Sequence, residues 1–449
     1  MIRRGSKQKA IILFTRVPEP GRTKTRMMPV YTGAECAEMQ TCFLRDIMAE
    51  LRRSGADVFV CYEPSGDLRR LRRICGRGPG YFAQSGEGLG ERMLNAFKEV
   101  FAKGYSSCVL TGSDIPEMTV GDIESAFDVL DHSDAVCGPT ADGGYCLIGM
   151  KRPLPELFDG KSYGHEKVID DLMAAADSNG IRMCKVRSHR DMDTPDDLLE
   201  YLTAMRKDAR LRRSHTGRFI RDHLRISVII PVYNESSTID RMISQLEDIK
   251  NECEIIFVDG GSTDDTLSRI PDDYRIIKSR KGRGAQMNAG ASASSGDILF
   301  FLHCDSELPK DPLGEIRRVM TRREAGCFGI AFHSRQFFMW TNRWISNGRA
   351  RIHGIMFGDQ GMFMTRDLFE RLGGFREIPV MEDYQFSLDL RRLGVKPGLA
   401  RHRIYTSDRR YPKATIPKLR LMHQMYRLRR EYKAGTSAEE ISRKYRDIR

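Results

Sequence analysis

Two stretches of this sequence, KAIILFTRVPEPG (9–21) and RISVIIPVYNES (225–236), share one pattern. Each is a short apolar run, rich in β-branched residues, that ends in a loop of Pro, Gly or polar residues. Such a run is typical of a strand that is buried on both faces, as the strands of parallel sheets are. Helical periodicity follows each run, in 33–55 and in 237–250. The sequence therefore predicts two tandem α/β units, each with a mostly parallel central sheet.

The length of the chain supports the same division. A single hydrophobic core usually stops growing at roughly 250–300 residues, and this chain has 449. We expect one domain over residues 9–203 and a second over 226–410. A basic linker, 204–225, would join them, and a basic helical tail, 411–449, would follow the second domain.

The composition indicates a protein of the cytoplasm. No stretch approaches the ~18 uninterrupted apolar residues that a membrane span needs. The eleven cysteines include no C-x-x-C pair, and several lie inside apolar runs. Cysteines used in this way are small buried hydrophobic residues in a reducing compartment.

The net charge of +12 is concentrated in two segments. Residues 206–225 carry eight Lys or Arg against two acids, and residues 401–449 carry fifteen against five. A solvated linker, a phosphorylated substrate and peripheral contact of the tail with an anionic membrane are all compatible with such segments. No aromatic residues are interleaved with a basic face, so we expect no nucleic-acid partner.

Acidic residues follow the predicted strands. Asp114, Asp259 and Asp305 each come directly after an apolar run. In parallel sheets the ligand site lies at the carboxyl ends of the strands. A single acid there is more often a helix cap or a turn residue, but the recurrence in two units favours a ligand site in each.

The second unit contains four motifs in a fixed order. They are IPVYNESSTI (230–239), IIFVDGGSTDDT (255–266), GRGAQMNAGASASSGDILFFLHCDS (282–306) and GGFREIPVMEDYQFSLDLRRLG (373–394). This set resembles family-2 glycosyltransferases. The resemblance implies a Rossmann-like A-type fold and an inverting transferase that uses a nucleotide-sugar donor.

The resemblance also implies residue assignments. Donor-binding positions would be Pro231, Tyr233, Glu235, Asp259 and Arg283. Asp305 would be the metal-binding carboxylate, with Mg²⁺ or Mn²⁺ as the cofactor.

Inverting transfer needs a base for the acceptor hydroxyl and a cation for the departing diphosphate. We expect Asp383 to be that base, with Glu382 as its neighbour. The alternative is that both acids only complement the dipole of the helix that they open.

The stretch FLHCDSELP (301–309) departs from the family pattern, because His303 replaces the first acid of the D-x-D motif. The segments LHCDS, FGDQGMFMTRDLFERLGGF, PVMEDYQFS and TSDRRY are similar to a bacterial subfamily associated with arsenosugar-biosynthesis gene clusters, in which His-x-Asp is usual. His303 would then contact the metal or the donor phosphate. Arg409 and Arg410 would lie against the donor diphosphate, unless they belong to a solvated tail.

The first unit carries five motifs of its own. They are RVPEPGRTKTRMMP (16–29), QSGEGLGERMLNAF (84–97), LTGSDIPEMT (110–119), GPTADGGYCLIGM (138–150) and DMDTPDDLLEYL (191–202). Together they resemble predicted sugar nucleotidyltransferase-like proteins related to molybdenum-cofactor and phospholactate guanylyltransferases, which also occur in arsenosugar clusters.

This second resemblance assigns the residues of the first unit. Lys24 would be a catalytic phosphate ligand in a loop with Gly21, Arg22 and Arg26. Gln84 would contact the base, and Asp114 and Asp193 would bind metal. The substrate loop would consist of Asp142, Gly143 and Gly144.

The combined expectation is a bifunctional nucleotide-sugar enzyme. The second domain would transfer a glycosyl group to the hydroxyl of a small-molecule or lipid-like acceptor, and the first would form or bind an activated nucleotide-sugar or polyol. In the alternative, only the glycosyltransferase is catalytic and the first domain is a nucleotide-binding scaffold.

Overall fold

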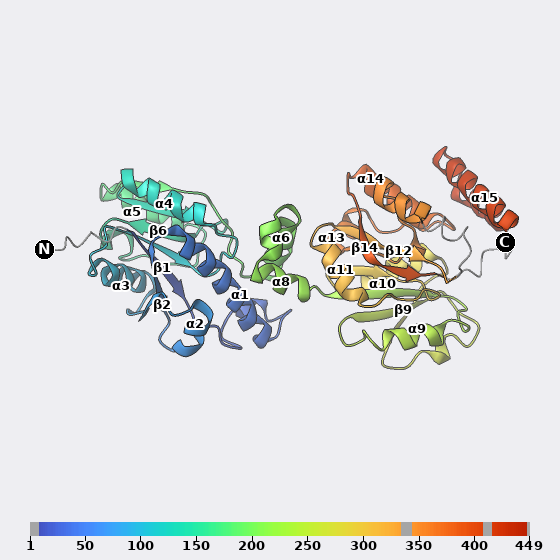
Figure 1. Cartoon of the computed structure of the whole chain (residues 1–449), viewed down its shortest axis with the longest axis horizontal. Coiled ribbons are helices and arrows are strands. Elements are labelled where there is room, and N and C mark those ends of the chain that lie inside the picture. Colours follow the sequence, from blue (N-terminus) through green and yellow to red (C-terminus); the bar gives the residue numbers. More distant parts are fainter. Residues whose placement is uncertain (1–8, 334–343, 407–414, 447–449) are drawn as a thin grey trace. The chain divides into compact units, whose positions relative to one another are not determined.

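The computed structural model describes residues 9–333, 344–406 and 415–446, and it divides into two compact units between Ile220 and Arg221. Within the described residues each unit contains one seven-stranded sheet with helices packed against it (Figure 1). The predicted fold class, two tandem α/β domains with mostly parallel sheets, is confirmed.

The elements of the first unit alternate as the sequence predicts. Its strands are β1 (Lys9–Thr15), β2 (Asp57–Tyr62), β3 (Gly80–Ala83), β4 (Ser107–Gly112), β5 (Ala135–Pro139), β6 (Tyr145–Met150) and β7 (Met183–Lys185). Its helices are α1 (Gly33–Leu51), α2 (Leu68–Cys75), α3 (Leu89–Phe101), α4 (Val120–His132), α5 (Val168–Ser178), α6 (Pro195–Lys207), α7 (Ala209–Arg213) and α8 (His215–Asp222).

The second unit repeats this alternation. Its strands are β8 (Ile226–Val232), β9 (Glu254–Asp259), β10 (Arg275–Lys278), β11 (Ile298–Phe301), β12 (Ala325–Ala331), β13 (Met362–Thr365) and β14 (Gly398–Tyr405). Its helices include α9 (Ile239–Leu246), α10 (Arg283–Ala293), α11 (Pro312–Met320), α13 (Arg366–Arg371), α14 (Glu382–Arg392), α15 (Thr415–Lys433) and α16 (Ala438–Arg446).

The two sheets have the same topology. The strand orders are β3-β2-β1-β4-β6-β5-β7 and β10-β9-β8-β11-β13-β12-β14. In each sheet the sixth strand of the unit, β6 or β13, runs antiparallel to both of its neighbours, and the other pairs are parallel. The chain therefore builds one architecture twice.

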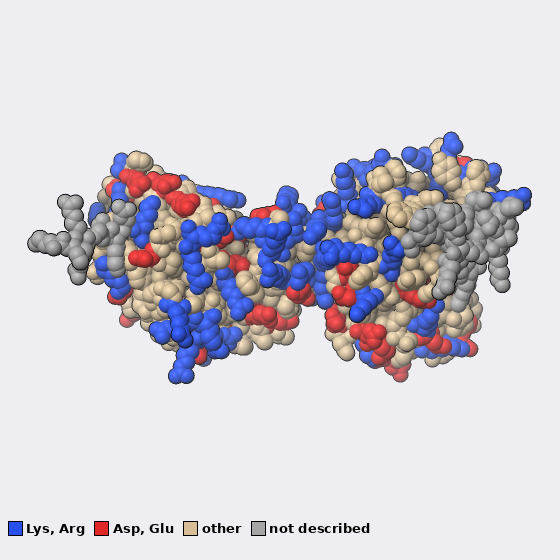
Figure 2. All heavy atoms as spheres, in the orientation of Figure 1, with Lys and Arg blue, Asp and Glu red and all other residues tan. Residues whose placement is uncertain are grey.

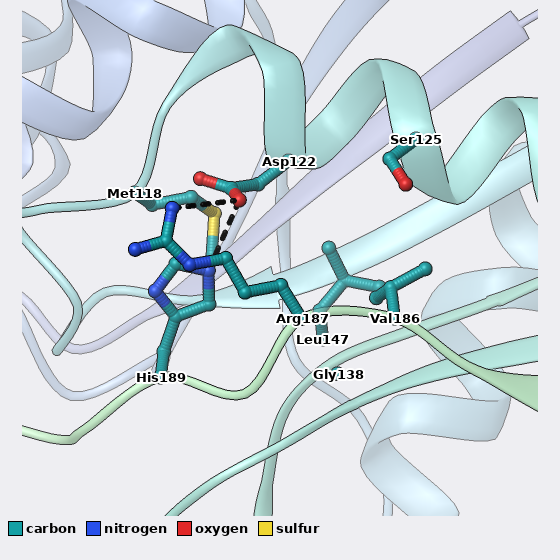
Figure 3. A pocket seen from close by; sticks show the side chains of 8 residues that line it. All are labelled: Met118, Asp122, Ser125, Gly138, Leu147, Val186, Arg187 and His189. Atoms are coloured by element: carbon teal, nitrogen blue, oxygen red, sulfur yellow. Dashed lines mark ion pairs between the residues drawn. The ribbon is translucent and has the colours of Figure 1, made fainter.

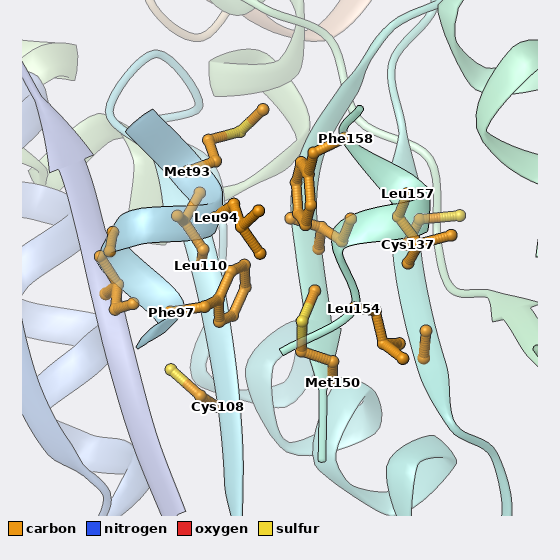
Figure 4. Close-up of a cluster of buried hydrophobic side chains, with 14 of the residues drawn as sticks. Met93, Leu94, Phe97, Cys108, Leu110, Cys137, Met150, Leu154, Leu157 and Phe158 are labelled. Atoms are coloured by element: carbon orange, nitrogen blue, oxygen red, sulfur yellow. The ribbon is translucent and has the colours of Figure 1, made fainter. Parts of the chain in front are cut away.

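Alternate residues of the central strands enter cores on opposite faces of the sheet. Ile12 packs with Leu110 and Phe97 on one face, and Ile11 packs with Val109 on the other. Figure 4 shows Phe97 and Leu94 of α3 against Cys108 and Leu110 of β4. Because a strand's side chains alternate between its two faces, a continuous apolar run such as IILF fills both cores.

The segment predicted as a basic linker, 204–225, is largely helical. It contains the end of α6, all of α7 and α8, and most of it belongs to the first unit. The carboxylate of Asp46, on α1, accepts hydrogen bonds from the backbone N–H groups of His215 and Thr216 at 2.8 Å each. Lys and Arg gather on the surface of these helices (Figure 2). The basic residues are thus the solvated face of docked helices.

The basic tail is also folded in its described part. Leu428 of α15 and Ile441 of α16 are buried against Met381, just before α14. Over the described ranges, no helix combines the length and the apolar content that crossing a bilayer requires.

We predict that Asp46→Ala lowers the free energy of unfolding by about 1–2 kcal/mol, because it removes the side chain that caps α8. The measurement is urea unfolding together with hydrogen exchange of the α8 amides. Asp128→Ala, at an exposed position of α4, is the matched control and should have little effect. Equal stability and equal exchange in the two variants would show that α8 does not depend on this contact.

Candidate functional sites

A buried glutamine joins the first two strands of each sheet at their carboxyl ends. The Nε2 of Gln84 donates to the carbonyls of Thr15 and Cys61, at 3.2 and 3.4 Å. In the second unit, the Nε2 of Gln286 donates to the carbonyls of Val232 and Val258, both at 2.8 Å. These carbonyls occupy equivalent positions, because Thr15 pairs with Tyr62 and Val232 pairs with Asp259.

This arrangement qualifies the prediction that Gln84 contacts a base. Gln84 is buried and its amide N–H groups hold the backbone. In this conformation only its Oε1 is available to a nucleobase.

Lys24 is the centre of the first candidate site. Its Nζ lies 2.7 Å from Asp114 Oδ1 and 2.8 Å from Asp193 Oδ1, and it donates to the carbonyl of Met192 at 2.7 Å. The Lys24 side chain is only 5% exposed, and its backbone adopts a left-handed conformation with φ 52°. Burial lowers the pKa of Lys24, but the two carboxylates outweigh this and raise it. The structure thus brings together three residues that the sequence predicted for one site.

Asp191 is a further acid of this cluster that the sequence reading did not select. Its pKa is raised to about 7, by burial first and then by repulsion from Asp114, Asp193 and Asp142, while Lys24 opposes the shift. The four carboxylates and one ammonium leave this cluster with a net negative charge, although no group of three or more acidic, His or Cys side chains in the described part of the chain is arranged to hold a metal ion.

The loops around Lys24 have tight geometry. Gly21 has φ +75°, and a Cβ on Gly33 would lie 2.7 Å from the Gly21 nitrogen, so the loop packs closely on the start of α1. Arg26 approaches Asp193 at 3.7 Å, whereas the exposed Arg22 pairs with Glu19 instead.

The predicted substrate loop is an equally tight turn. Gly143 has φ +86°, and a Cβ there would lie 1.9 Å from the carbonyl oxygen of Glu166. The carboxylate of Asp142 accepts from the Gly144 N–H at 3.2 Å. Only glycine fits at position 143.

An ion pair beside this site holds the segment that carries Asp191 and Asp193. The Nε2 of His189 lies 3.4 Å from the carboxylate of Asp122, and Arg187 lies 3.9 Å from it (Figure 3). Burial would raise the pKa of Asp122, but hydrogen bonds from His189 and Thr119 outweigh it and lower the pKa. Since the His189 backbone also bonds to Pro139 and Ala141, His189 connects the 191–193 segment to the predicted substrate loop.

The second candidate site begins at the ends of β8 and β9. The buried carboxylate of Asp259 accepts from the N–H groups of Gly261 and Ser262 at 3.1 and 2.9 Å. The Nζ of Lys281 lies 3.9 Å from the centre of the Tyr233 ring. Glu235 accepts from the Thr238 hydroxyl at 2.6 Å, and Pro231 lies within β8. These residues lie at or beside the edge where the resemblance expects the nucleoside.

His303 and Asp383 both lie next to Gly358. The Gly358 N–H donates to Asp383 Oδ2 at 2.8 Å. A Cβ on Gly358 would lie 2.6 Å from His303 Nε2 and 3.5 Å from the same Asp383 oxygen. The predicted metal or phosphate contact and the predicted base therefore both lie next to the same glycine.

The two acids that open α14 have different surroundings. Glu382 is buried and pairs with Arg283 at 3.1 Å. Burial and the neighbouring Asp383 raise the pKa of Glu382, although Arg283 opposes them. Asp383 is only partly buried, and its Oδ1 accepts from the Tyr384 N–H at 2.6 Å. Asp383 is therefore the more accessible carboxylate.

Asp305 is partly buried on the loop after β11, and its side chain has no ion pair within the described ranges. No group of three or more His, Cys, Asp or Glu residues there forms a metal cage. A metal at Asp305 would need further oxygen ligands from a bound diphosphate. Arg409 and Arg410 lie outside the described residues.

Two family profiles match the chain. Residues 46–165 match DUF2064, described as an uncharacterized protein conserved in bacteria, and residues 227–375 match glycosyl transferase family 2. The chain joins a DUF2064 domain to a family-2 glycosyltransferase domain. The arsenosugar and guanylyltransferase links stay predictions.

One similar solved structure is that of a provisionally assigned nucleotide-diphospho-sugar transferase from Desulfovibrio desulfuricans G20. The two sequences are 34% identical over the matched region. The match covers 47% of this chain and 94% of that protein, with a TM-score of 0.45.

Two curated relatives are also similar. An undecaprenyl-phosphate 4-deoxy-4-formamido-L-arabinose transferase of Pseudomonas fluorescens is 27% identical over 31% of this chain and 45% of its own length. An uncharacterized glycosyltransferase of Nostoc sp. is 36% identical over 18% of this chain and 28% of its own length. The chain thus spans less than half of either relative.

The acid cluster of the DUF2064 domain predicts a pH-dependent stability. Because the folded-state pKa of Asp191 is raised, stability falls as the pH rises from about 4, the unfolded value, to about 7. Asp191→Asn should therefore raise the melting temperature at pH 8, by about 2–4 °C for each kcal/mol added to the free energy of unfolding. At pH 5 the effect should be smaller. The measurement is thermal unfolding in EDTA.

The control for this prediction is Asp196→Asn, at an exposed position of α6. It should shift the melting temperature by a small and similar amount at both pH values. A pH-independent effect of Asp191→Asn would contradict the raised pKa.

Proposed function

We propose that the family-2 domain transfers a glycosyl group from a nucleotide-diphosphate sugar to an acceptor hydroxyl with inversion. We further propose that the DUF2064 domain forms or binds an activated nucleotide-sugar or polyol, in the cytoplasm. The main observation in support of the first proposal is that His303 and Asp383 both lie next to Gly358. The ion pair of Glu382 with Arg283 involves the residue that precedes Asp383.

Asp383 has the position that a general base requires. Both of its oxygens are oriented by backbone N–H groups, those of Gly358 and Tyr384. Such contacts fix the carboxylate without neutralising it, and the remaining lone pairs can accept a proton. Glu382 is less suited, because Arg283 already pairs with it.

The proposed step is a direct displacement. The acceptor oxygen forms a bond to the anomeric carbon while the bond from that carbon to the donor diphosphate breaks. The hydroxyl proton passes to Asp383, and the nucleoside diphosphate leaves from the opposite face, which inverts the configuration.

Mg²⁺ or Mn²⁺ would be held by Asp305, with His303 against the metal or the diphosphate. When bound, such an ion stabilises the negative charge that develops on the leaving diphosphate. The chain's own cations on the donor side include Lys281, over the Tyr233 ring.

We predict that Asp383→Asn lowers kcat by about 10²–10⁴-fold, the usual contribution of a positioned base, and leaves donor binding intact. The donor is first chosen from UDP-, GDP-, ADP- and CDP-sugars by thermal shift with Mn²⁺. Turnover is then followed as release of the nucleoside diphosphate with a panel of polyol and lipid acceptors. Asp389→Asn, six residues further along α14, is the control, and full turnover in Asp383→Asn would assign the base elsewhere.

For the DUF2064 domain, the arrangement around Lys24 supports nucleotidyl transfer. This reaction needs cations on the α-phosphate and an incoming phosphate as nucleophile, with no protein nucleophile. Lys24, Asp114 and Asp193 supply one ammonium and two carboxylates in contact. The product would be the donor of the family-2 domain. The alternative is a nucleotide-binding scaffold.

We predict that Lys24→Met lowers the melting temperature without metal, because it leaves Asp114 and Asp193 without their shared cation. Mn²⁺ should then stabilise the variant more than the wild type, since the amine no longer competes for these carboxylates. Lys103→Met, at a surface pair with Glu99, is the control.

The same variant decides between catalysis and scaffold. Wild-type protein with NTPs, Mg²⁺ and sugar phosphates should release pyrophosphate, and Lys24→Met should not. If the wild type releases none, the scaffold alternative holds.

A further inference from the structure

The helix α2 of the DUF2064 domain carries a concentration of arginine. Residues 68–77 read LRRLRRICGR and contain five arginines and no acid. These are Arg69, Arg70, Arg72, Arg73 and Arg77. Figure 2 shows Lys and Arg side chains gathered over α2, whose place is labelled in Figure 1. The patch is a surface of its own, because neither candidate site includes these residues.

The packing of α2 turns its arginines outward. Leu71 and Cys75 are buried in one of the two cores of the domain. Residues three and four apart share one face of a helix, so the apolar positions take one side of α2. The exposed side chains of the helix are Arg69, Arg72 and Arg73. The helix connects β2 to the edge strand β3, and it therefore presents a face of guanidinium groups at the outer edge of the sheet.

Carboxylates do not neutralise this face. None of the five arginines forms an ion pair in the described part of the chain. The one acid of the sequence between residues 64 and 80 is Asp67, whose carboxylate accepts from the backbone N–H of Arg69 at 2.8 Å. The guanidinium carbon of Arg72 lies 5.3 Å from the centre of the Tyr81 ring. The positive charge of the face therefore stays available to an external anion.

Two neighbouring arginines show what a structural role looks like here. Arg52, just after α1, donates to the carbonyl of Cys75, the last residue of α2. Arg53 pairs with Glu50 at 3.1 Å. These contacts satisfy a helix end and balance a charge, whereas the arginines of 69–77, apart from the one over the Tyr81 ring, make no such side-chain contact with the described residues.

The arrangement also works against the stability of α2. Like charges three or four residues apart destabilise a helix. Arg69 forms such pairs with Arg72 and Arg73, and Arg70 forms one with Arg73. The folded helix thus gains nothing from holding these charges together, and a bound polyanion would relieve their repulsion.

We propose that the arginine face of α2 docks the DUF2064 domain on an anionic phospholipid surface. Guanidinium binds phosphate oxygens in a bidentate manner and is more weakly hydrated than an ammonium group. A membrane presents many phosphate groups in one plane, which matches several arginines on one exposed helix face. The segment 68–77 has no aromatic residue on which a base could stack, so a nucleic acid fits this face less well. The inference goes beyond both proposed reactions and does not depend on them.

The experiment is flotation of the full-length protein with phosphatidylcholine vesicles, with and without phosphatidylglycerol. We expect binding only to the vesicles that contain phosphatidylglycerol, and loss of binding at high ionic strength, because salt screens exposed charges. Arg69→Gln/Arg73→Gln should weaken the vesicle affinity by about 20-fold, since each cation near an anionic surface contributes about fivefold.

The matched control is Lys151→Gln/Arg152→Gln, which removes the same charge at exposed positions just after β6. It should bind the vesicles like the wild type. Glutamine is a good helix former, and removing like charges from α2 should leave the melting temperature of Arg69→Gln/Arg73→Gln unchanged or higher. A weaker vesicle affinity of this variant would then not be due to unfolding.

Equal vesicle affinity of the two double variants would assign membrane binding to another segment, such as the basic tail, and would overturn the proposal. A wild-type protein that does not float with the anionic vesicles would overturn it as well. Binding of polyuridine RNA that depends on Arg69 and Arg73, without arginine-dependent binding of vesicles, would assign the face to nucleic acid instead.

Discussion

Both domains depend on a parallel strand that is hydrogen-bonded on its two edges and covered on its two faces. β1 lies between β2 and β4, and β8 lies between β9 and β11. The strand order turns back at each of these strands, and in parallel sheets the ligand site lies at the carboxyl ends beside such a turning point. The buried amides of Gln84 and Gln286 join the strand carbonyls at that edge. The polar backbone that the fold must satisfy is therefore part of the edge at which we propose the sites.

The two proposed sites differ in how they balance charge. In the DUF2064 domain, the ammonium of Lys24 lies between carboxylates, so that acids and cation already neutralise part of one another's charge. In the family-2 domain, the side chain of Asp305 has no ion pair among the described residues, whereas Glu382 pairs with Arg283.

Several features were predicted from short segments alone. The apolar runs at 9–15 and 226–232 fill both faces of a sheet because strand side chains alternate, and the acids that follow β4, β9 and β11 lie at the ligand edge. The family resemblance of the first unit implied a site with Lys24, Asp114 and Asp193, and the structure brings these three side chains into contact. The helices of the segment 204–225 were not predicted. Its charge indicated a linker, but Asp46, far away in sequence, caps a helix there.

The sequence by itself determined the two α/β domains, their strands and the acids at the strand ends, because periodicity and apolar runs are local properties of the chain. Tertiary structure alone decided which of these side chains meet. Burial, together with three nearby acids, raises the pKa of Asp191. Arg283 pairs with Glu382 across the domain, and the helix α15 brings Arg429 to Phe357. Such contacts depend on how loops and helices pack over long separations, and no short segment encodes that packing.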